Sequence, residues 1–277
     1  MENLDTFSTV LFVDECLMDE ERTHAFENAI QNTVKAGDIV VDAGTGSGIL
    51  ALFSARAGAE KVYGIEIDEA SAALARKSVQ ANPDGKKIEV VVADARSFTL
   101  PAAADVVTME LMDTGLISEQ QAVVMNALRK GGVIDSHTKL IPSKVVCAAE
   151  LVSYDFDFYG FHMPLVMQAR NNGVDARVTN YFSEKTPYQN VDFSDIVETL
   201  VKSRVTITPT KDGEVNAIRL TTQTFLTSEI TVWGTSDMNM PVVIPIKPIQ
   251  VKVGENVNVL IQYEMGKGFE NFSLIVE

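Results

Sequence analysis

Hydrophobic and polar positions alternate in two different ways along the chain. From about residue 39 to residue 132, short β-branched runs such as "IVVDAG" alternate with longer amphipathic stretches such as "ILALFSARAGA". This alternation is typical of βαβ units that build a parallel sheet covered on both faces. The preceding stretch "MDEERTHAFENAIQNTV" predicts a helix that is acidic in its first turn, with Phe26, Ile30 and Val34 on one apolar stripe.

The helical period disappears after about residue 143. The runs that follow, such as "SRVTITPT", "EITVWG" and "NVNVLIQYEM", are strand-like and are separated by Gly, Asp, Asn or Pro. We therefore predict an α/β fold, with a Rossmann-like domain over residues 1–143 followed by an all-β barrel or sandwich over residues 144–277. Residues 163–195 show neither period clearly and are interpreted as an inserted arm or a lid.

Composition and charge narrow the classes of function. Hydrophobic residues make up 46% and charged residues 22% of the 277 residues, as in an ordinary globular protein. No apolar run approaches membrane-spanning length, and the acidic start "MENLDTF" lacks the basic region of a signal peptide, so we expect a cytoplasmic protein with no membrane partner. The two cysteines and three histidines are scattered, which argues against a disulfide framework or a metal site. The net charge of -15 argues against broad nucleic-acid binding and favours a cationic substrate.

A glycine-rich turn follows the first predicted strand. In "DAGTGSG", the glycines at 44, 46 and 48 allow a tight turn and a close approach of the backbone to a ligand. Glu66 ends the second predicted strand, about 20 residues further on, where an acid accepts hydrogen bonds from ribose hydroxyls. Taken alone, the turn is a weak signal. The less favoured alternatives are an empty tight loop for the turn and a solvated strand-end carboxylate for Glu66.

The spacing of this turn is G-x-G-x-G rather than the G-x-G-x-x-G of a pyrophosphate binder. It resembles the cofactor loop of class I S-adenosylmethionine (AdoMet) methyltransferases. The resemblance implies that AdoMet lies across the carboxyl ends of the strands. The cofactor-binding residues that it implies here are Asp42, Gly44, Gly46, Gly48, Glu66, and Asp94 with its neighbour Ala95 near the adenine. Asp94 is equally well explained as a turn residue.

Two glutamates stand nine positions apart in "MELMDTGLISE". One interpretation is structural: Ser118 caps a helix, Gln121 completes a capping box, Glu119 favours the helix dipole, and Glu110 merely ends a strand. The other is functional. Glu110 ends the fourth predicted strand at the sheet edge where a methyl donor would lie, and the following loop returns Glu119 to the same crevice.

At this point the sequence resembles the protein arginine methyltransferases, whose fourth strand leads into a loop with two glutamates at this spacing. In "DEERTHAFENAI", Arg22 stands where a family arginine contacts the AdoMet carboxylate, and "FYGFHMP" resembles a segment at the start of the family's barrel. The resemblance covers residues 16–164. It implies Glu110 and Glu119 as catalytic residues, a cationic protein or peptide substrate, and a head-to-tail homodimer joined by an arm. The aromatic residues expected to pack on the neighbour are Tyr181, Phe182 and Tyr188.

The sequence also departs from that family. Where the family carries a Thr-His-Trp segment in the barrel, residues 236–238 read Ser-Asp-Met, so that Asp237 is expected to face the like charge of Asp19 unless a substrate cation or a proton intervenes. Thr114 and Phe26 stand where tyrosines are common. These departures motivate one alternative, a methyltransferase of a small amine or another non-arginine acceptor. A second alternative, from another class, is a catalytically silent AdoMet-binding partner protein. A nucleic-acid amino-methyltransferase is disfavoured because "ELMD" is not the Asn/Asp-Pro-Pro-aromatic motif of those enzymes.

Overall fold

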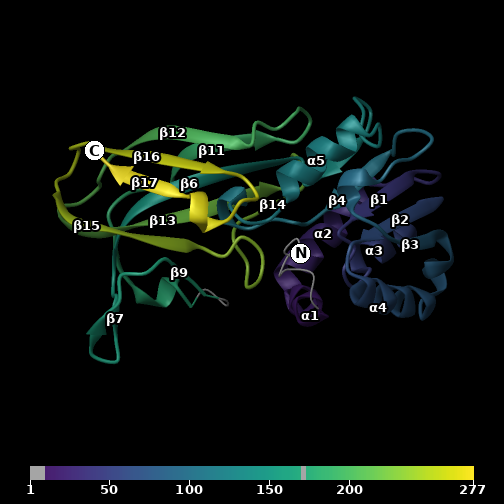
Figure 1. Cartoon of the computed structure of the whole chain (residues 1–277), viewed down its shortest axis with the longest axis horizontal. Helices are drawn as coiled ribbons and strands as arrows, with labels where there is room; N and C mark the ends of the chain where they lie inside the picture. The colour runs from purple at the N-terminus through teal and green to yellow at the C-terminus, as the bar shows by residue number, and fades with distance from the viewer. Residues whose placement is uncertain (1–9, 170–172) are drawn as a thin grey trace.

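The computed structural model describes residues 10–169 and 173–277. The acidic start of the chain and residues 170–172 lie outside this part. The described chain forms two halves that lie side by side along the longest axis of the molecule, an α/β half and a β half (Figure 1). The predicted order of a Rossmann-like domain followed by an all-β domain is therefore confirmed.

The α/β half is built on a parallel sheet with the strand order β3-β2-β1-β4-β5. The order reverses beside β1, which pairs with β2 on one side and β4 on the other, and ligands of open α/β sheets bind at the carboxyl ends of the strands at such a point. The strands are β1 (Ile39–Ala43), β2 (Lys61–Glu66), β3 (Ile88–Val92), β4 (Val106–Met109) and β5 (Lys139–Ile141).

The helices of this half begin with two where the sequence predicted one. Asp19 separates them and caps the second, since its carboxylate accepts a hydrogen bond from the Arg22 backbone N–H at 3.1 Å. Phe26 and Ile30 are fully buried on the predicted stripe. The helices are α1 (Val10–Met18), α2 (Glu20–Thr33), α3 (Ile49–Ala57), α4 (Glu69–Gln80) and α5 (Gln121–Lys130), with 3-10 turns η1 (Pro83–Lys87), η2 (Ala95–Ser97) and η3 (Thr114–Leu116).

The β half is antiparallel and is organised around two long strands, β6 and β13, which pair with each other. The strand β6 also pairs with β10 and β11, and β13 with β14 and β15. A second sheet has the order β12-β16-β17. The elements are β6 (Lys144–Tyr154), β7 (Asp157–Phe158), β8 (Phe161–His162), β9 (Met167–Gln168), η4 (Asp175–Arg177), β10 (Val178–Tyr181), β11 (Thr186–Asp192), β12 (Leu200–Ile207), β13 (Gly213–Phe225), β14 (Thr231–Val232), β15 (Val242–Val251), β16 (Val257–Glu264), η5 (Phe269–Asn271) and β17 (Ser273–Val276).

The predicted arm is only partly separate from the barrel sheet. Strands β10 and β11 pair with β6, and the aromatic side chains of Phe182 and Tyr188 are 4% and 6% exposed. The expectation that these two residues pack on a neighbouring molecule is therefore wrong. The hairpin β7–β8 forms a two-stranded sheet of its own and projects from the barrel (Figure 1). Large apolar side chains are exposed in and just after it, including Tyr159, Phe161 and Leu165.

The two halves share one hydrophobic core. Buried Leu116 and Ile117, in the loop after β4, belong to the same cluster as Leu220 of β13 and Tyr263 of β16. The loop that carries the two glutamates is therefore packed between the domains. No helix of residues 10–169 and 173–277 is long and apolar enough to cross a membrane.

Candidate active site

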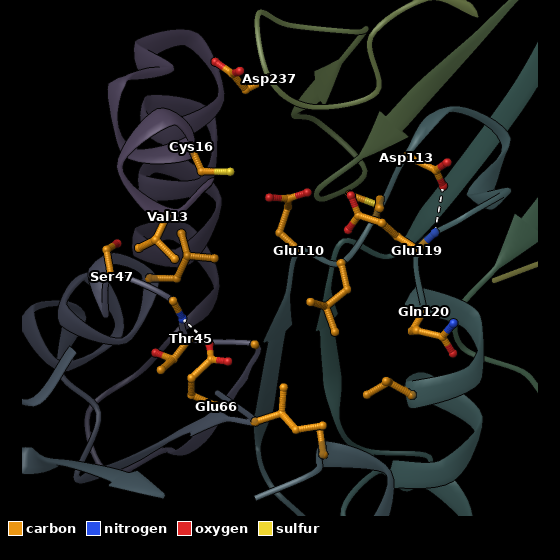
Figure 2. Close-up of a pocket in the computed structure, with 18 of the residues that line it drawn as sticks. Val13, Cys16, Thr45, Ser47, Glu66, Glu110, Asp113, Glu119, Gln120 and Asp237 are labelled. Carbon is orange, nitrogen blue, oxygen red and sulfur yellow. Dashed lines mark hydrogen bonds between the residues drawn. The ribbon is translucent and has the colours of Figure 1, made fainter. Parts of the chain in front are cut away.

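A pocket lies at the carboxyl ends of β1, β2 and β4, between the N-terminal helices and the loop that follows β4. Figure 2 shows Glu66 at one end of it, and Glu110 and Glu119 pointing into the same space at the other end. That space lies between the helix carrying Cys16 and the loop carrying Asp113. The crevice predicted from the strand order is therefore present, and both glutamates face it.

The glycine-rich turn forms the floor of this pocket. Gly44 and Gly46 have φ angles of 76° and 51°, and a Cβ atom on Gly44 would lie 2.6 Å from Leu111 Cδ2. The Gly46 backbone N–H donates to Glu66 Oε2 at 3.0 Å, and the Asp68 N–H donates to Oε1 at 3.0 Å. These two hydrogen bonds direct the Glu66 carboxylate beside bare backbone, which fits a ligand with vicinal hydroxyls such as a ribose.

Two residues predicted to contact the cofactor lie behind the turn instead. Asp42 is fully buried and does not line the pocket; its carboxylate accepts hydrogen bonds from the hydroxyls of Thr45 at 2.7 Å and Thr108 at 2.8 Å. Burial raises the pKa of Asp42 to about 6, against the opposing effect of these hydrogen bonds. Gly48 is the N-cap of α3 and has the left-handed conformation, and a Cβ atom there would lie 3.3 Å from Val79. Both residues shape the turn from behind rather than touch the pocket.

Asp94 and Ala95 line the pocket as predicted, next to the end of β3. The Asp94 carboxylate caps the 3-10 turn η2 by accepting from the Arg96 N–H, and it also forms an ion pair with the Arg96 guanidinium at 2.7 Å. Hydrogen bonding from the Arg96 side chain lowers the pKa of Asp94. Asp94 therefore has both features expected of it: it caps a turn and it lines the pocket.

Arg22 also lines the pocket, but its guanidinium is engaged with a glutamate. The Nε and Nη2 atoms both donate to Glu110 Oε2, the first at 2.9 Å, and Nη1 donates to the Cys16 carbonyl at 3.0 Å. Burial opposes the charge of Arg22, yet the Glu110 carboxylate raises its pKa overall. The guanidinium carbon lies 5.6 Å from the centre of the Phe26 ring. Arg22 therefore connects the N-terminal helix to the first of the two glutamates.

The capping interpretation of the second glutamate is wrong. Helix α5 begins at Gln121 with Gln120 as its N-cap, so that Ser118 is not the cap and Glu119 is not in the first turn. The Gln121 side chain instead accepts from the Leu111 N–H at 2.9 Å. The backbone N–H groups of Ser118 and Glu119 both donate to the Asp113 carboxylate, the second at 3.2 Å. The loop thus has its own internal scaffold, and Glu119 is presented to the pocket before the helix begins.

The helix and the barrel are joined beside the pocket without a histidine. Asp19 Oδ2 accepts from the hydroxyl of Thr235 and from the backbone N–H of Asp237 at 3.0 Å. The Ser236 hydroxyl donates to the Asp237 carboxylate at 3.1 Å. Asp19 therefore meets the backbone amide of Asp237, which is a favourable contact beside the like-charged carboxylate of the same residue.

Some residues of the pocket were not predicted from the sequence. Cys16 lines it, and burial raises the pKa of its thiol to about 12, which keeps it protonated and without nucleophilic character at neutral pH. Asp113 also lines the pocket. Its position between the two glutamates in the sequence is the signal that could have identified it as a residue of the site. The direction of its side chain depends on the fold of the loop and could not be predicted. Within residues 10–169 and 173–277, no group of three or more His, Cys, Asp or Glu residues is arranged to hold a metal ion.

Similar sequences cover both halves of the chain. A family model described as ribosomal protein L11 methyltransferase (PrmA) matches residues 21–139. An uncharacterized protein of Methanocaldococcus jannaschii is 33% identical over 258 residues, which make up 93% of this chain and 93% of that protein. An arginine N(omega)-methyltransferase of Streptomyces achromogenes subsp. streptozoticus is 28% identical over 86% of this chain and 72% of its own length.

Solved structures share the fold over the whole chain. A chain of the Trypanosoma brucei PRMT1 enzyme–prozyme heterotetrameric complex with AdoHcy has a TM-score of 0.78 at 18% identity, and the match covers 99% of this chain and 98% of that chain. Protein arginine methyltransferase 10 of Arabidopsis thaliana has a TM-score of 0.77 at 20% identity, over 93% of this chain and 88% of its own.

The chain has the fold of the protein arginine methyltransferases, and the matching family model and the relatives support an AdoMet-dependent class I methyltransferase. Within this class, the chain belongs to the family of the Methanocaldococcus jannaschii protein.

Proposed function

We propose that this protein transfers the methyl group of AdoMet to a nitrogen of a cationic acceptor, foremost the guanidinium of arginine, and that Glu110 and Glu119 hold that cation. The observation that carries the proposal is that both carboxylates face one space at the acceptor end of the pocket (Figure 2). Glu110 already binds a guanidinium, that of Arg22, through two donors to one carboxylate oxygen.

One end of the pocket is proposed to bind AdoMet and the other end to bind the acceptor. AdoMet supplies an electrophilic methyl group on a sulfonium when it is bound. The turn around Gly46 and the carboxylate of Glu66 fit its ribose, and Asp94 and Ala95 stand where the adenine is implied by the resemblance. We further propose that Arg22 binds the carboxylate of AdoMet while it keeps its contact with Glu110. This placement directs the methyl group toward the two glutamates.

The chemistry explains the use of two carboxylates. A guanidinium stays protonated at ordinary pH and offers N–H donors in a planar fork, so two carboxylates fix its plane and select the nitrogen that faces the methyl group. Alignment at a near-attack distance of about 3 to 3.5 Å removes several kcal/mol of the barrier to an in-line displacement. The positive charge is drawn toward the nitrogens that the glutamates hold. The target nitrogen becomes more nucleophilic as a result.

A second candidate acceptor follows from the changed barrel segment. Asp237 lines the pocket where the related family carries a histidine, and Thr114, at a common tyrosine position, is buried and donates to the Met240 carbonyl at 2.6 Å. Asp237 changes the pocket wall directly, and Thr114 lies behind the wall residue Met240. Together they favour a small amine or another non-arginine cation as the alternative. A labelled-AdoMet assay with separate pools of peptides, proteins and small amines tests the proposal. Transfer to arginine supports it, transfer to amines alone supports the alternative, and no transfer supports a silent AdoMet-binding partner.

We also propose that a second copy of the chain docks on the hairpin β7–β8 and the segment after it. Tyr159 is 100% exposed, Phe161 70% and Leu165 55%, which is unfavourable for apolar side chains left in water. The hairpin stands away from the rest of the barrel (Figure 1). Light scattering at micromolar concentration is expected to show a dimer, and Phe161→Ser is expected to weaken it. A monomeric wild-type protein contradicts this assembly.

A further inference from the structure

Asp113 is a third carboxylate in the loop that carries the two glutamates. Its side chain folds back into the loop: Oδ1 and Oδ2 accept from the Ser118 N–H at 3.0 and 2.9 Å, and Oδ1 also accepts from the Glu119 N–H at 3.2 Å. Its backbone carbonyl accepts from the Leu116 N–H at 2.9 Å. One residue therefore spans the turn and holds the two backbone N–H groups at its far end, and Figure 2 shows the contact with Glu119.

The rest of the loop is held by other groups. At the start of the loop, the Leu111 N–H donates to the Gln121 side chain and the Leu111 carbonyl accepts from the Gln121 N–H. These two hydrogen bonds fix the chain next to Glu110. In its middle, Gly115 donates to Thr222 Oγ1 at 2.8 Å and accepts from the Tyr263 hydroxyl at 2.7 Å. These contacts secure the loop as far as its middle. Beyond the middle, the carbonyls of Leu116 and Ile117 accept from the backbone N–H groups of Gly266 and Gly268, and the Gln120 side chain donates to the Gly266 carbonyl. Asp113 supplies the contacts to the N–H groups of Ser118 and Glu119.

The loop needs such a scaffold because its backbone is not regular. Gly115 has a φ of 77° and Leu116 a φ of 56°, a conformation that costs energy for a residue with a side chain. After this reversal the chain has no helical hydrogen bonds until Gln121 begins α5. A charged acceptor forms stronger hydrogen bonds to backbone N–H groups than a neutral one. The Asp113 carboxylate thus fixes the direction in which Glu119 leaves the backbone.

We propose that Asp113 is a positioning residue that acts through Glu119, so that it sets the geometry of the acceptor site without touching the acceptor. The inference rests on the proposed role of Glu119 as a clamp on a cation. Burial raises the pKa of Asp113 to about 6, against the backbone hydrogen bonds of Glu119 and Ser118, so its carboxylate is ionised at pH 8 and accepts from both N–H groups.

The test compares Asp113→Ala with Asp113→Asn at pH 8. The probes are a blocked peptide with one internal arginine as acceptor and AdoHcy as cofactor ligand. Asp113→Ala is expected to lower kcat/KM for the peptide by at least about tenfold, with a fall in kcat, because a small displacement of a catalytic group is costly. The affinity for AdoHcy is expected to stay within about twofold. Asp113→Asn keeps one acceptor oxygen and is expected to recover part of the loss.

Asp135→Ala is the matched control. Its carboxylate also accepts from two backbone N–H groups, those of His137 at 2.8 Å and Thr138 at 3.2 Å, but it lies in the loop before β5, at the end of the sheet away from the pocket. This variant loses the same kind of contact and is expected to leave kcat/KM unchanged. Thermal melting of all variants reports on folding.

A double-mutant cycle separates an action through Glu119 from any other. If Asp113 acts through Glu119, Asp113→Ala has little further effect on kcat/KM in a Glu119→Gln background. Equal effects in both backgrounds, an equal loss of AdoHcy affinity, or a folded Asp113→Ala enzyme with wild-type kcat/KM overturns the inference. If Glu119→Gln alone leaves turnover unchanged, the proposed clamp fails instead, so the two failures are distinguishable.

Discussion

Arg22 on helix α2 and Glu110 at the end of β4 form a buried ion pair in which two donors of the guanidinium meet one carboxylate oxygen. Their side chains are 7% and 9% exposed. The pair connects the N-terminal helix to the acceptor end of the pocket, across 88 positions of sequence. Helix, cofactor end and acceptor end are therefore joined by one contact, and the stability of the helix position depends on it.

The first prediction concerns this pair. Arg22→Ala leaves the Glu110 carboxylate buried without its partner, and we expect a loss of about 3 to 5 kcal/mol in the free energy of unfolding, as for other broken buried pairs. Arg22→Ala combined with Glu110→Gln removes the orphaned charge and is expected to recover part of this loss. Urea denaturation measures both variants. An Arg22→Ala protein as stable as the wild type contradicts the prediction.

The second prediction concerns the cofactor end. Glu66→Ala removes a carboxylate that is directed by two backbone N–H groups, and we expect weaker AdoHcy binding by about 1 to 3 kcal/mol in calorimetry. Glu69→Ala is the control, because Glu69 is an exposed acid in the first turn of α4 and does not line the pocket. Equal effects of both substitutions show that net charge, not the ribose contact, controls binding.

The third prediction concerns pH. The pKa of Asp42 is raised to about 6 by burial, whereas an unfolded chain gives aspartate a pKa of about 3.9. The folded state thus binds the proton more tightly, and ionised Asp42 lowers stability above pH 6. As pH falls from about 7.5 to about 5, this group is expected to add about 1 kcal/mol to the free energy of unfolding. Asp42→Asn is expected to lack that gain, and a wild-type pH slope in this variant contradicts the assignment.

The fourth prediction concerns the charge of the acceptor. Among the described residues that line the pocket, the acidic ones outnumber the basic ones: Glu15, Glu66, Asp94, Glu110, Asp113, Glu119 and Asp237 against Arg22 and Arg96. Arg22 is paired with Glu110 and is proposed to meet the AdoMet carboxylate, and Arg96 is paired with Asp94, so neither is left for a carboxylate of the acceptor. A free carboxylate on the acceptor is therefore disfavoured.

Nα-acetyl-arginine amide is expected to be methylated with a kcat/KM at least about tenfold above that of free arginine, a difference of about 1.4 kcal/mol. The citrulline analogue has nearly the same shape without the charge and is expected to be inert. Faster methylation of free arginine than of the amide shows that the chain recognises the α-carboxylate and contradicts this account.

The fold was predictable from periodicity because each half repeats one pattern. The strands around Val41 and Ile65 are buried runs, and the stripe of Phe26 and Ile30 points into the core as its spacing requires. The predicted helix corresponds to α2, but α1 before it was missed, because the apolar residues of Val10–Met18 form no clear one-sided stripe. The burial of Tyr188 was missed as well, since it depends on the pairing of β11 with β6 far away in the sequence.

The site was predictable in composition more than in geometry. The turn at Gly44 and the acid at Glu66 were found from the spacing that a βαβ unit imposes, and both line the pocket. Asp42 was expected at the ligand but lies behind the turn. A strand-end acid can point in either direction, and the hydroxyl that holds Asp42 belongs to Thr108 on another strand. The role of Gln121 was misread for a similar reason: its partner Leu111 lies across a loop whose path no local pattern specifies.

The most direct test of the central claim is single-turnover methyl transfer by Glu119→Gln, with AdoHcy affinity and thermal melting measured on the same protein. Because Glu119 lies outside α5, the substitution is not expected to change helix stability. The clamp predicts that transfer to the arginine acceptor falls by at least roughly a hundredfold while AdoHcy affinity stays nearly unchanged, as when an electrostatic contact in a desolvated site is lost. Glu110→Gln is expected to show the same fall. A stable Glu119→Gln enzyme with wild-type transfer rates contradicts the clamp and leaves the two glutamates without a shared role.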